Sequence, residues 1–250
     1  MWSNDLFVEV RTERGEVRFT VGEDIERDSA HFTDPVFVGD SLALAITNSI
    51  ASEGFSVWDV STGLEVLRES LLTDGYPFFT SVGASNLLLV SAAEGIAFWD
   101  LNPSKLRLRR VAPERSAEAA TFHAPTRRLA YYVHDVVRIT HPWMPMVEHE
   151  ARMSYCIGMT WAREGRVLIV VNGEVSVLLD PVSGQTLGSI PLTGSILCQS
   201  DCGRWIAFWH GLVDVETMSM KPHRARAGYF DTKARGFVFV DENSVWRVPI

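Results

Sequence analysis

Short apolar segments separated by polar turns recur along the whole chain. Leu87–Val90, Val167–Val171 and Phe237–Phe239 are typical, and Gly, Asp, Asn or Ser residues separate such runs from one another. Runs of this length, rich in β-branched and aromatic residues, predict β-strands joined by hairpins. No segment shows apolar residues spaced by three and four positions, as an amphipathic helix requires. The pattern predicts an all-β protein with no helix longer than about two turns.

One of these segments returns at a regular interval. Residues 55–63 (FSVWDVSTG) reappear as residues 96–103 (IAFWDLNP) and, more weakly, as residues 175–184 (VSVLLDPVSG). Their Asp residues are Asp59, Asp100 and Asp180, so the intervals are 41 and 80 residues, or one and two periods of about 40. Residues 136–140 occupy the position of the intervening copy, and residues 211–217 form a degenerate further one. A period of this length indicates a repeat architecture.

A second signature precedes each copy, and it consists of a polar turn followed by an apolar run. It is found in residues 126–132, 164–170, 201–208 and 234–239. The turn and the run predict a hairpin between the first two strands of a repeat. Each repeat is therefore expected to contain four short strands.

Four strands per repeat, with Trp-Asp at the end of the third strand, resemble the WD-repeat β-propeller family. The resemblance is carried by Trp58-Asp59, Trp99-Asp100, the turns that end at Gly63 and Gly184, and the hairpin 201–204. It covers nearly the whole chain and implies four-stranded blades around a central channel, with the first strand innermost. The Gly-His pair that is usual before the first strand is replaced by residues 75–76 (GY) and 194–195 (GS). The resemblance therefore implies blades that are held together by packing.

The expected fold is a single β-propeller domain that covers residues 1–250. Its blades are predicted at residues 35–70, 77–110, 119–149, 157–191, 196–222 and 227–250, the last completed by residues 5–20. Six blades is the favoured count, and the surplus of strands at the N-terminus leaves seven as the alternative. Closure by N-terminal strand material is expected because open sheet edges promote aggregation.

Composition narrows the function classes. The chain has 250 residues, 46% of them hydrophobic, and a net charge of −8, which excludes a disordered protein and disfavours nucleic-acid binding. No run approaches the length of a membrane span, and no secretory signal is predicted. Three Cys residues suit a reducing cytoplasm, and the excess of Arg over Lys favours a bacterial source. We therefore expect a cytoplasmic bacterial protein that binds neither nucleic acid nor a membrane.

Catalytic signatures are not found in the sequence. There is no Gly-rich phosphate loop, no His-Glu-x-x-His and no Gly-x-Ser-x-Gly, and the seven His residues share no metal-ligand spacing. We expect no catalytic residues, no metal site and no cofactor. The sequence makes no prediction of the oligomeric state.

The loop 141–146 is the sharpest local signal for a partner. Where other repeats have short Ser- and Gly-containing turns, this one has six residues: His141, Pro142, Trp143, Met144, Pro145 and Met146. Two Pro residues stiffen the loop, and exposed Trp and Met side chains are typical of protein interfaces. We predict that it contacts a protein partner; the alternative is that Trp143 covers a neighbouring blade.

Polar residues gather in the turns between second and third strands, which emerge on one face of a propeller. The candidates there are Glu94, His134, Asp135, Glu174 and His210. Carboxylates and imidazoles that converge could act as general acids and bases, but hairpin turns favour polar residues for backbone reasons alone.

Three hypotheses follow. The first is a non-enzymatic protein-interaction platform, as a subunit of a bacterial multiprotein assembly; it rests on fold-level analogy. The second is a propeller hydrolase or lyase with its site at the channel mouth. The third is a small-molecule or glycan binder that uses exposed Trp. It needs exposure of residues such as Trp161, Trp205, Trp209 or Trp246, for which core packing is the default expectation.

Overall fold

The computed structural model describes residues 2–4, 7–11, 16–21, 31–38, 42–48, 54–70, 78–81, 87–92, 95–100, 107–112, 117–142, 146–225, 227–231, 235–241 and 244–250. The chain divides into two compact units, Met1–Ala117 and Glu118–Ile250, which we call the N-terminal and C-terminal units.

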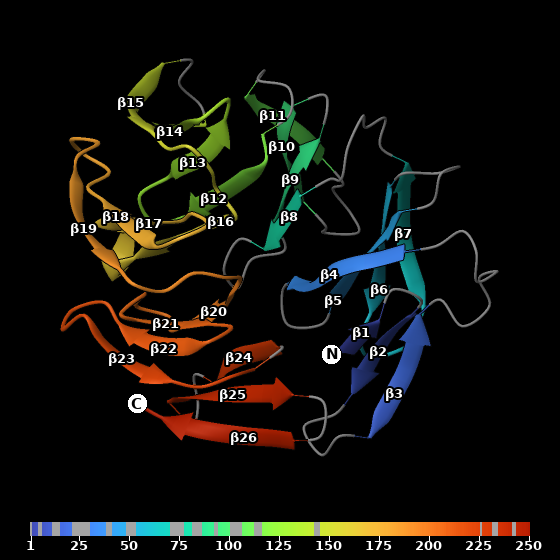
Figure 1. Ribbon diagram of the computed structural model, residues 1–250. Coiled ribbons are helices and arrows are strands. Elements are labelled where there is room, and N and C mark those ends of the chain that lie inside the picture. The colour runs from blue at the N-terminus through green and yellow to red at the C-terminus, as the bar shows by residue number, and fades with distance from the viewer. Residues whose placement is uncertain are drawn as a thin grey trace. The chain divides into compact units, whose positions relative to one another are not determined.

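The N-terminal unit contains three antiparallel sheets (Figure 1). The first consists of β1 (Trp2–Asn4), β2 (Phe7–Arg11) and β3 (Val17–Val21). The second consists of β4 (His31–Val38), β5 (Leu42–Asn48), β6 (Gly54–Asp59) and β7 (Glu65–Ser70). The third consists of β8 (Phe78–Ser81), β9 (Leu87–Ala92), β10 (Gly95–Asp100) and β11 (Arg107–Ala112).

The C-terminal unit contains four sheets. They are β12 (Ala119–His123), β13 (Arg128–Val133), β14 (Val136–Thr140) and β15 (Val147–Arg152); β16 (Gly158–Ala162), β17 (Val167–Val171), β18 (Ser176–Leu179) and β19 (Thr186–Ile190); β20 (Ile196–Gln199), β21 (Trp205–Phe208), β22 (Gly211–Asp214) and β23 (Ser219–Pro222); and β24 (Ala227–Asp231), β25 (Gly236–Asp241) and β26 (Ser244–Pro249).

The prediction of an all-β chain is confirmed. Among the described residues the only helix is the single turn η1 (Arg163–Gly165). The repeated Asp lies at the end of a third strand, as predicted: Asp59 ends β6, Asp100 ends β10, and Asp180 directly follows β18. The described residues form seven sheets, five of four strands and two of three strands.

Neighbouring sheets within each unit pack side by side. In the C-terminal unit the first strands β12, β16, β20 and β24 lie next to one another in that order. Buried apolar side chains fill the space between successive sheets, for example Trp161 and Leu168 against Tyr132, and Phe208 against Ile169. The core is therefore a series of layers between sheets, each built from the alternating inward-facing residues of both.

The N-terminal residues form a sheet of their own, since β1 and β3 both pair with β2. Within its unit this sheet lies against β4. The predicted completion of the blade at 227–250 by residues 5–20 would join strands of different units, and it stays a prediction. None of the described helices is long and apolar enough to cross a membrane.

Candidate functional site

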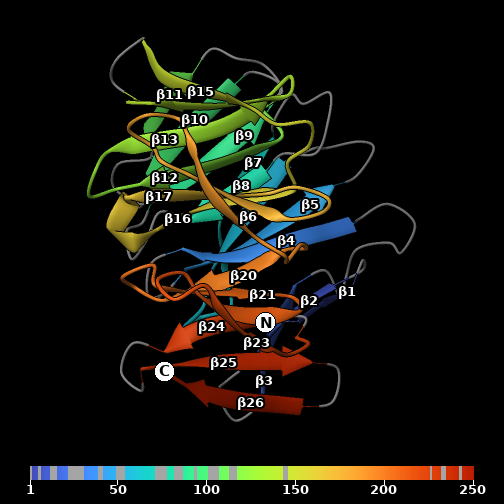
Figure 2. The same ribbon diagram turned by 60° about the vertical axis from the view of Figure 1, so that its left-hand side comes forward.

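Antiparallel pairing places two kinds of connection at opposite ends of the strands of the C-terminal unit. The turns from first to second strand and from third to fourth strand lie at one end. The turns from second to third strand and the connections between sheets lie at the other. Figure 2 shows these strands from the side, and the short coil between β16 and β17 marks the first end.

The first end carries charged side chains in the sheets β16–β19 and β20–β23. We call it the charged rim and define it as residues 163–166, 180–184, 200–204 and 214–218. Its charged members are Arg163, Glu164, Arg166, Asp180, Asp201, Arg204, Asp214 and Glu216.

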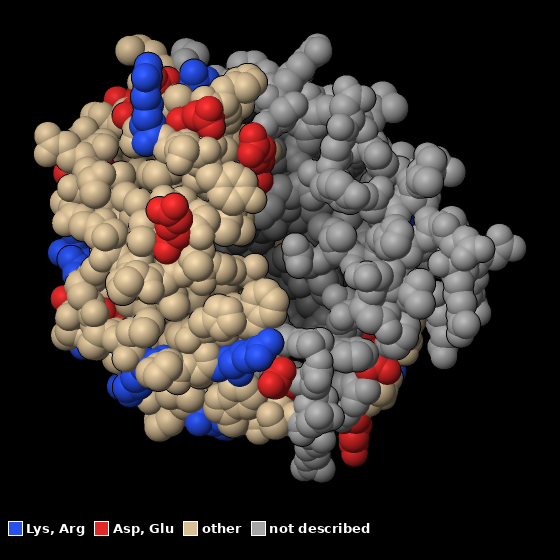
Figure 3. Space-filling view, in the orientation of Figure 1, with Lys and Arg blue, Asp and Glu red and all other residues tan. Residues whose placement is uncertain are grey.

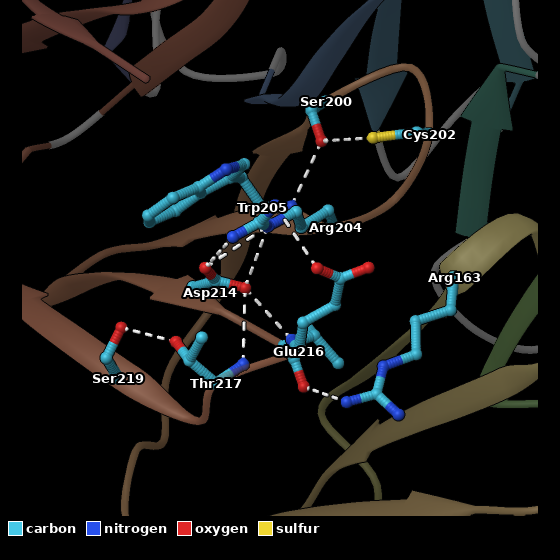
Figure 4. A network of polar contacts seen from close by, with 10 residues as sticks. Arg163, Ser200, Cys202, Arg204, Trp205, Asp214, Glu216, Thr217 and Ser219 are labelled. Carbon is cyan, nitrogen blue, oxygen red and sulfur yellow. Dashed lines mark hydrogen bonds and ion pairs between the residues drawn. The ribbon is translucent and has the colours of Figure 1, made fainter.

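Asp214 is the centre of a polar network in the charged rim (Figure 4). Its side chain is 3% exposed and accepts hydrogen bonds from Arg204, the shortest being 2.7 Å from Nη2 to Oδ2. Oδ1 also accepts from the backbone N–H groups of Glu216 and Thr217, at 2.9 and 3.4 Å. The hydrogen bonds from Arg204 and from the turn hold the pKa of Asp214 below its ordinary value of 3.8. The network closes the turn after β22.

The same Asx turn recurs where the sequence repeats. Asp180 Oδ1 accepts from the N–H of Val182 at 2.8 Å, and in the N-terminal unit Asp59 Oδ1 accepts from the N–H of Ser61 at 2.7 Å. Hydrogen bonds to the side chains of Ser183 and Ser61 lower the pKa of Asp180 and Asp59. An Asp that accepts from the N–H groups ahead of it defines a turn locally, so its repetition marks each strand end.

Four residues after each Asp the backbone is left-handed. Gly63 and Gly184 have φ of +71°, and the equivalent residue after Asp214 is Met218, with φ of +56°. Glycine adopts this conformation without steric cost, whereas Met218 does not. The turn geometry is therefore kept in the degenerate repeat even though its preferred residue is lost.

Contacts between sheets also use the charged rim. The Arg163 guanidinium donates to the Val215 carbonyl, and the N–H of Arg163 donates to the Gly203 carbonyl at 3.1 Å. A Cβ at Gly203 would lie 3.0 Å from Ala162 Cα, so glycine permits this close approach. Most polar groups of the charged rim therefore form hydrogen bonds that hold neighbouring turns together.

The predicted partner loop is described at its two ends. His141 is half-buried and Pro142 is buried, whereas Met146 is exposed. His141 Nδ1 lies 2.8 Å from the Arg127 carbonyl, and its Nε2 lies 3.1 Å from Glu148 Oε1. Residues 143–145, including Trp143, Met144 and Pro145, lie outside the described residues. The role of the loop in partner binding stays a prediction.

The described polar-face candidates occupy separate turns. His134 and Asp135 both have positive φ and form the two-residue turn between β13 and β14, where Asp135 accepts a 3.0 Å hydrogen bond from Tyr132. Glu174 lies in the next sheet and His210 in the one after it. No hydrogen bond or ion pair joins His134, Asp135, Glu174 and His210 across these turns. Glu94 lies outside the described residues.

The second end carries exposed aromatic and aliphatic side chains instead. We call it the aromatic rim and define it as residues 153–157, 172–175, 191–195 and 209–210. Tyr155 is 54% exposed, Ile157 39% and Trp209 36%. Glu174 is the one Asp, Glu, Lys or Arg residue in these four segments. The default expectation of core packing is therefore wrong for Trp209, although Trp161 is buried as expected.

The aromatic rim is continuous across three sheets. A Cβ at Gly173 would touch the Tyr155 ring at 3.6 Å, which places Tyr155 beside the turn between β17 and β18. Thr193 Oγ1 then donates to the Asn172 carbonyl at 2.8 Å. The N–H of Trp209 donates to the Ser195 carbonyl at 3.1 Å. The Trp209 ring stacks on His210, with ring centres 5.5 Å apart.

His223 lies next to this rim, where its N–H donates to the His210 carbonyl at 3.3 Å. Its ring packs against Phe239 at 4.1 Å, and both ring nitrogens are buried without a hydrogen-bond partner. Burial and, secondly, the nearby His210 lower the pKa of His223. Protonation of this imidazole is therefore disfavoured relative to a histidine in water.

The three cysteines are free, and burial raises the pKa of Cys156 and Cys198 to about 12. Thiols with such pKa values are poor nucleophiles at neutral pH. Among the described residues no group of three or more His, Cys, Asp or Glu residues could hold a metal ion.

Comparison with solved structures decides the fold. The β-propeller domain of Cps50 (Swd1) from Myceliophteria thermophila aligns with a TM-score of 0.67, over 98% of this chain and 91% of that chain. The chain has the β-propeller fold. Sequence identity in the alignment is 11%, so the likeness concerns the fold alone. No protein-family profile and no curated protein matches the sequence.

Proposed function

We propose that this propeller is a non-enzymatic protein-interaction platform, a divergent relative of the WD-repeat proteins that serves in a cytoplasmic bacterial assembly. The observation that carries the proposal is the aromatic rim, where Tyr155, Ile157 and Trp209 are exposed across three neighbouring sheets. Large aromatic side chains contribute strongly to protein–protein association when a partner buries them.

The rim is also preorganised for binding. Asn172 Oδ1 accepts hydrogen bonds from the N–H groups of Glu174 and Val175, both at 2.8 Å. The bonds of Thr193 and Trp209 to neighbouring carbonyls tie the adjacent segments to this turn. A backbone that is already ordered loses little conformational entropy when a partner binds, so more of the contact energy appears as affinity.

The charged rim is the less favourable surface for a partner, which supports the choice of the aromatic rim. Its Arg and Asp side chains bind one another and neighbouring turns, as Arg204 and Asp214 do at 2.7 Å. A partner that docked there would compete with bonds that stabilise the fold. At the aromatic rim it would cover apolar surface that is exposed to water, which is favourable.

Exposure of Trp209 keeps a sugar or small-molecule binder as the second candidate, because sugars stack on exposed indole rings. Against it, the Asn172 side-chain oxygen and the Thr193 hydroxyl are already used inside the rim. An enzyme gains no support from the described polar turns, since His134, Glu174 and His210 share no bond. The loop 141–146 is proposed as a further partner contact at the opposite end of the strands.

The proposal is tested by photo-crosslinking in lysates of the source organism. A photoreactive amino acid replaces Tyr155 in the full chain, and the matched control carries it at Glu164, an exposed position in the charged rim. We expect a defined protein to crosslink from position 155 and not from 164, and the purified protein to bind the wild-type chain reversibly. Equal crosslinking at both positions, or none at 155, would overturn the proposal.

A further inference from the structure

We infer that the aromatic rim binds an extended segment of its partner in which a Lys or Arg residue is flanked by apolar or aromatic residues, with the cation paired to Glu174. This inference rests on the proposed function and specifies the chemistry of the partner.

Glu174 is the observation that points to a cation. Its side chain is exposed, and its carboxylate makes no ion pair or hydrogen bond with any residue that the structure describes. In the charged rim, by contrast, both Asp214 and Glu216 pair with Arg204. The charge of Glu174 is therefore available to a ligand.

The uncharged surroundings of Glu174 allow its carboxylate to favour a positively charged ligand. Figure 3 shows that the described surface facing the viewer is largely uncharged, with charged groups mostly toward its margin. Within the rim, the turn that bears Glu174 lies beside Tyr155 and is linked through Asn172 and Thr193 to the segment next to Trp209. A charge among apolar groups is screened less once a partner excludes water, so it favours an opposite charge over a like one.

The same arrangement favours an extended peptide over other cations. Tyr155 and Ile157 are exposed just before β16, in the sheet that bears Glu174, and Trp209 is exposed in the next sheet. A basic residue with apolar residues before and after it can satisfy all three features at once. The Tyr155 ring, which lies beside Gly173, can add cation–π attraction to the pairing.

Gly173 offers a test position beside Tyr155. Its φ lies outside the left-handed region, and among the described residues an added Cβ would meet only the Tyr155 ring, at ordinary contact distances of 3.6 and 4.0 Å. The fold therefore does not require glycine at this position. We expect Gly173→Ala to fold normally and to add a methyl group against the Tyr155 ring.

The test uses a display library of short random peptides selected on the immobilised full chain, with affinities of the enriched peptides measured by titration. We expect enriched peptides to share one Lys or Arg between apolar residues. Tyr155→Ala and Gly173→Ala should weaken binding of these peptides, and Glu174→Gln should weaken it about three- to tenfold.

Reversing the charge at position 174 is the decisive experiment for the predicted basic residue of the peptide. Selection on Glu174→Lys should replace the shared basic residue by Asp or Glu, whereas the matched reversal Glu164→Lys in the charged rim should leave the selected pattern unchanged. Thermal melting of each variant verifies that the fold is retained.

The outcomes separate this inference from the proposed function. Peptides that need Tyr155 but show no basic position, or an unchanged pattern on Glu174→Lys, would overturn the inference and leave the platform standing. Peptides that bind without regard to Tyr155 and Trp209 would overturn both. Failure to enrich any peptide would overturn the inference alone, because a folded partner surface could still crosslink at position 155.

Discussion

The charged rim and the aromatic rim lie at opposite ends of the strands of the sheets β16–β19 and β20–β23, and the aromatic rim also includes the connection from β15 to β16. The two rims differ in what their side chains do. At the charged rim Arg204 and Asp214 pair with each other, and Arg163 reaches a carbonyl of the neighbouring turn. At the aromatic rim the turns are closed by short-range bonds such as those of Asn172, and Tyr155 and Trp209 remain exposed. The polar side chains of the charged rim therefore stabilise the fold, whereas Tyr155 and Trp209 of the aromatic rim are exposed.

The difference shows how two carboxylates in similar turns can have different surroundings in this fold. Asp214 is buried and accepts hydrogen bonds from three residues, whereas Glu174 is exposed and accepts none from the described residues. Both are turn carboxylates in neighbouring sheets, and only their partners tell them apart. The following predictions test that contrast, from the largest expected effect to the smallest.

The largest effect is expected on stability at the charged rim. Asp214→Ala leaves the N–H groups of Glu216 and Thr217 without their acceptor and removes the partner of Arg204. We expect a loss of about 3 kcal/mol in the free energy of unfolding, measured by urea denaturation. Glu174→Ala is the matched control at the aromatic rim, and a comparable loss there would abolish the contrast.

The next effect is expected on binding at the aromatic rim. Tyr155→Ala removes an exposed ring, so partner affinity should fall about thirtyfold, or about 2 kcal/mol, while the melting temperature stays nearly constant. Titration calorimetry with the crosslinked partner measures the change. Leu187→Ala is the control, because Leu187 is equally exposed on β19 outside both rims. A Tyr155→Ala variant that keeps its affinity for the partner, or whose melting temperature falls sharply, would contradict the assignment.

A smaller effect is expected at the degenerate turn. Met218→Gly relieves a left-handed backbone at a non-glycine residue, and we expect a gain of about 0.5–1 kcal/mol in stability. The reciprocal change Gly184→Met should destabilise, since a Cβ there would lie 3.3 Å from His149 Cβ. Denaturation midpoints of the two variants should move in opposite directions, and movement in the same direction would refute the equivalence of the turns.

The smallest effect is expected from pH. Burial lowers the pKa of His123, near the charged rim, and of His223, near the aromatic rim, below the ordinary 6.5. Their contribution to stability is therefore fully present above pH 6.5 and is lost as the pH falls through the folded-state pKa values. The effect is modest because both rings are only partly buried and water screens the charge. Melting temperatures should fall less steeply below pH 6.5 in His123→Gln and His223→Gln, and unchanged slopes would contradict the assignment.

The features that could be predicted from the sequence are those that depend on local interactions. The Asp-x-x-Ser/Thr-Gly turns form through bonds between neighbours in sequence, such as Asp180 with Val182, so their position at strand ends could be predicted. Short runs of β-branched and aromatic residues between polar turns likewise predicted the strands. Six blades was the favoured count and seven the alternative, and the described residues form seven sheets, of which β1, β2 and β3 are one.

The candidate site was harder to predict, and Trp209 shows why. It follows a buried strand and looks like a core residue in sequence, but the connection between β19 and β20 passes beside it at Gly194 and Ser195 and leaves the ring partly exposed. Tyr155 gave no sequence signal because it lies in an irregular connection. Tyr155 precedes a first strand and Trp209 directly follows a second strand, so aromatic residues in these two kinds of connection are the signal that could have found the rim.

By itself, the sequence determined the strands, the repeat and the turns, since each depends on residues within a few positions of one another. Tertiary structure alone decided which turn residues are buried and which stay exposed. Asp214 and Glu174 have the same carboxyl group, but Asp214 is buried and accepts hydrogen bonds from Arg204 and from the N–H groups of Glu216 and Thr217, whereas Glu174 is exposed. The partners of Asp214 lie within ten residues of it in the chain, but its burial depends on how whole sheets pack against one another.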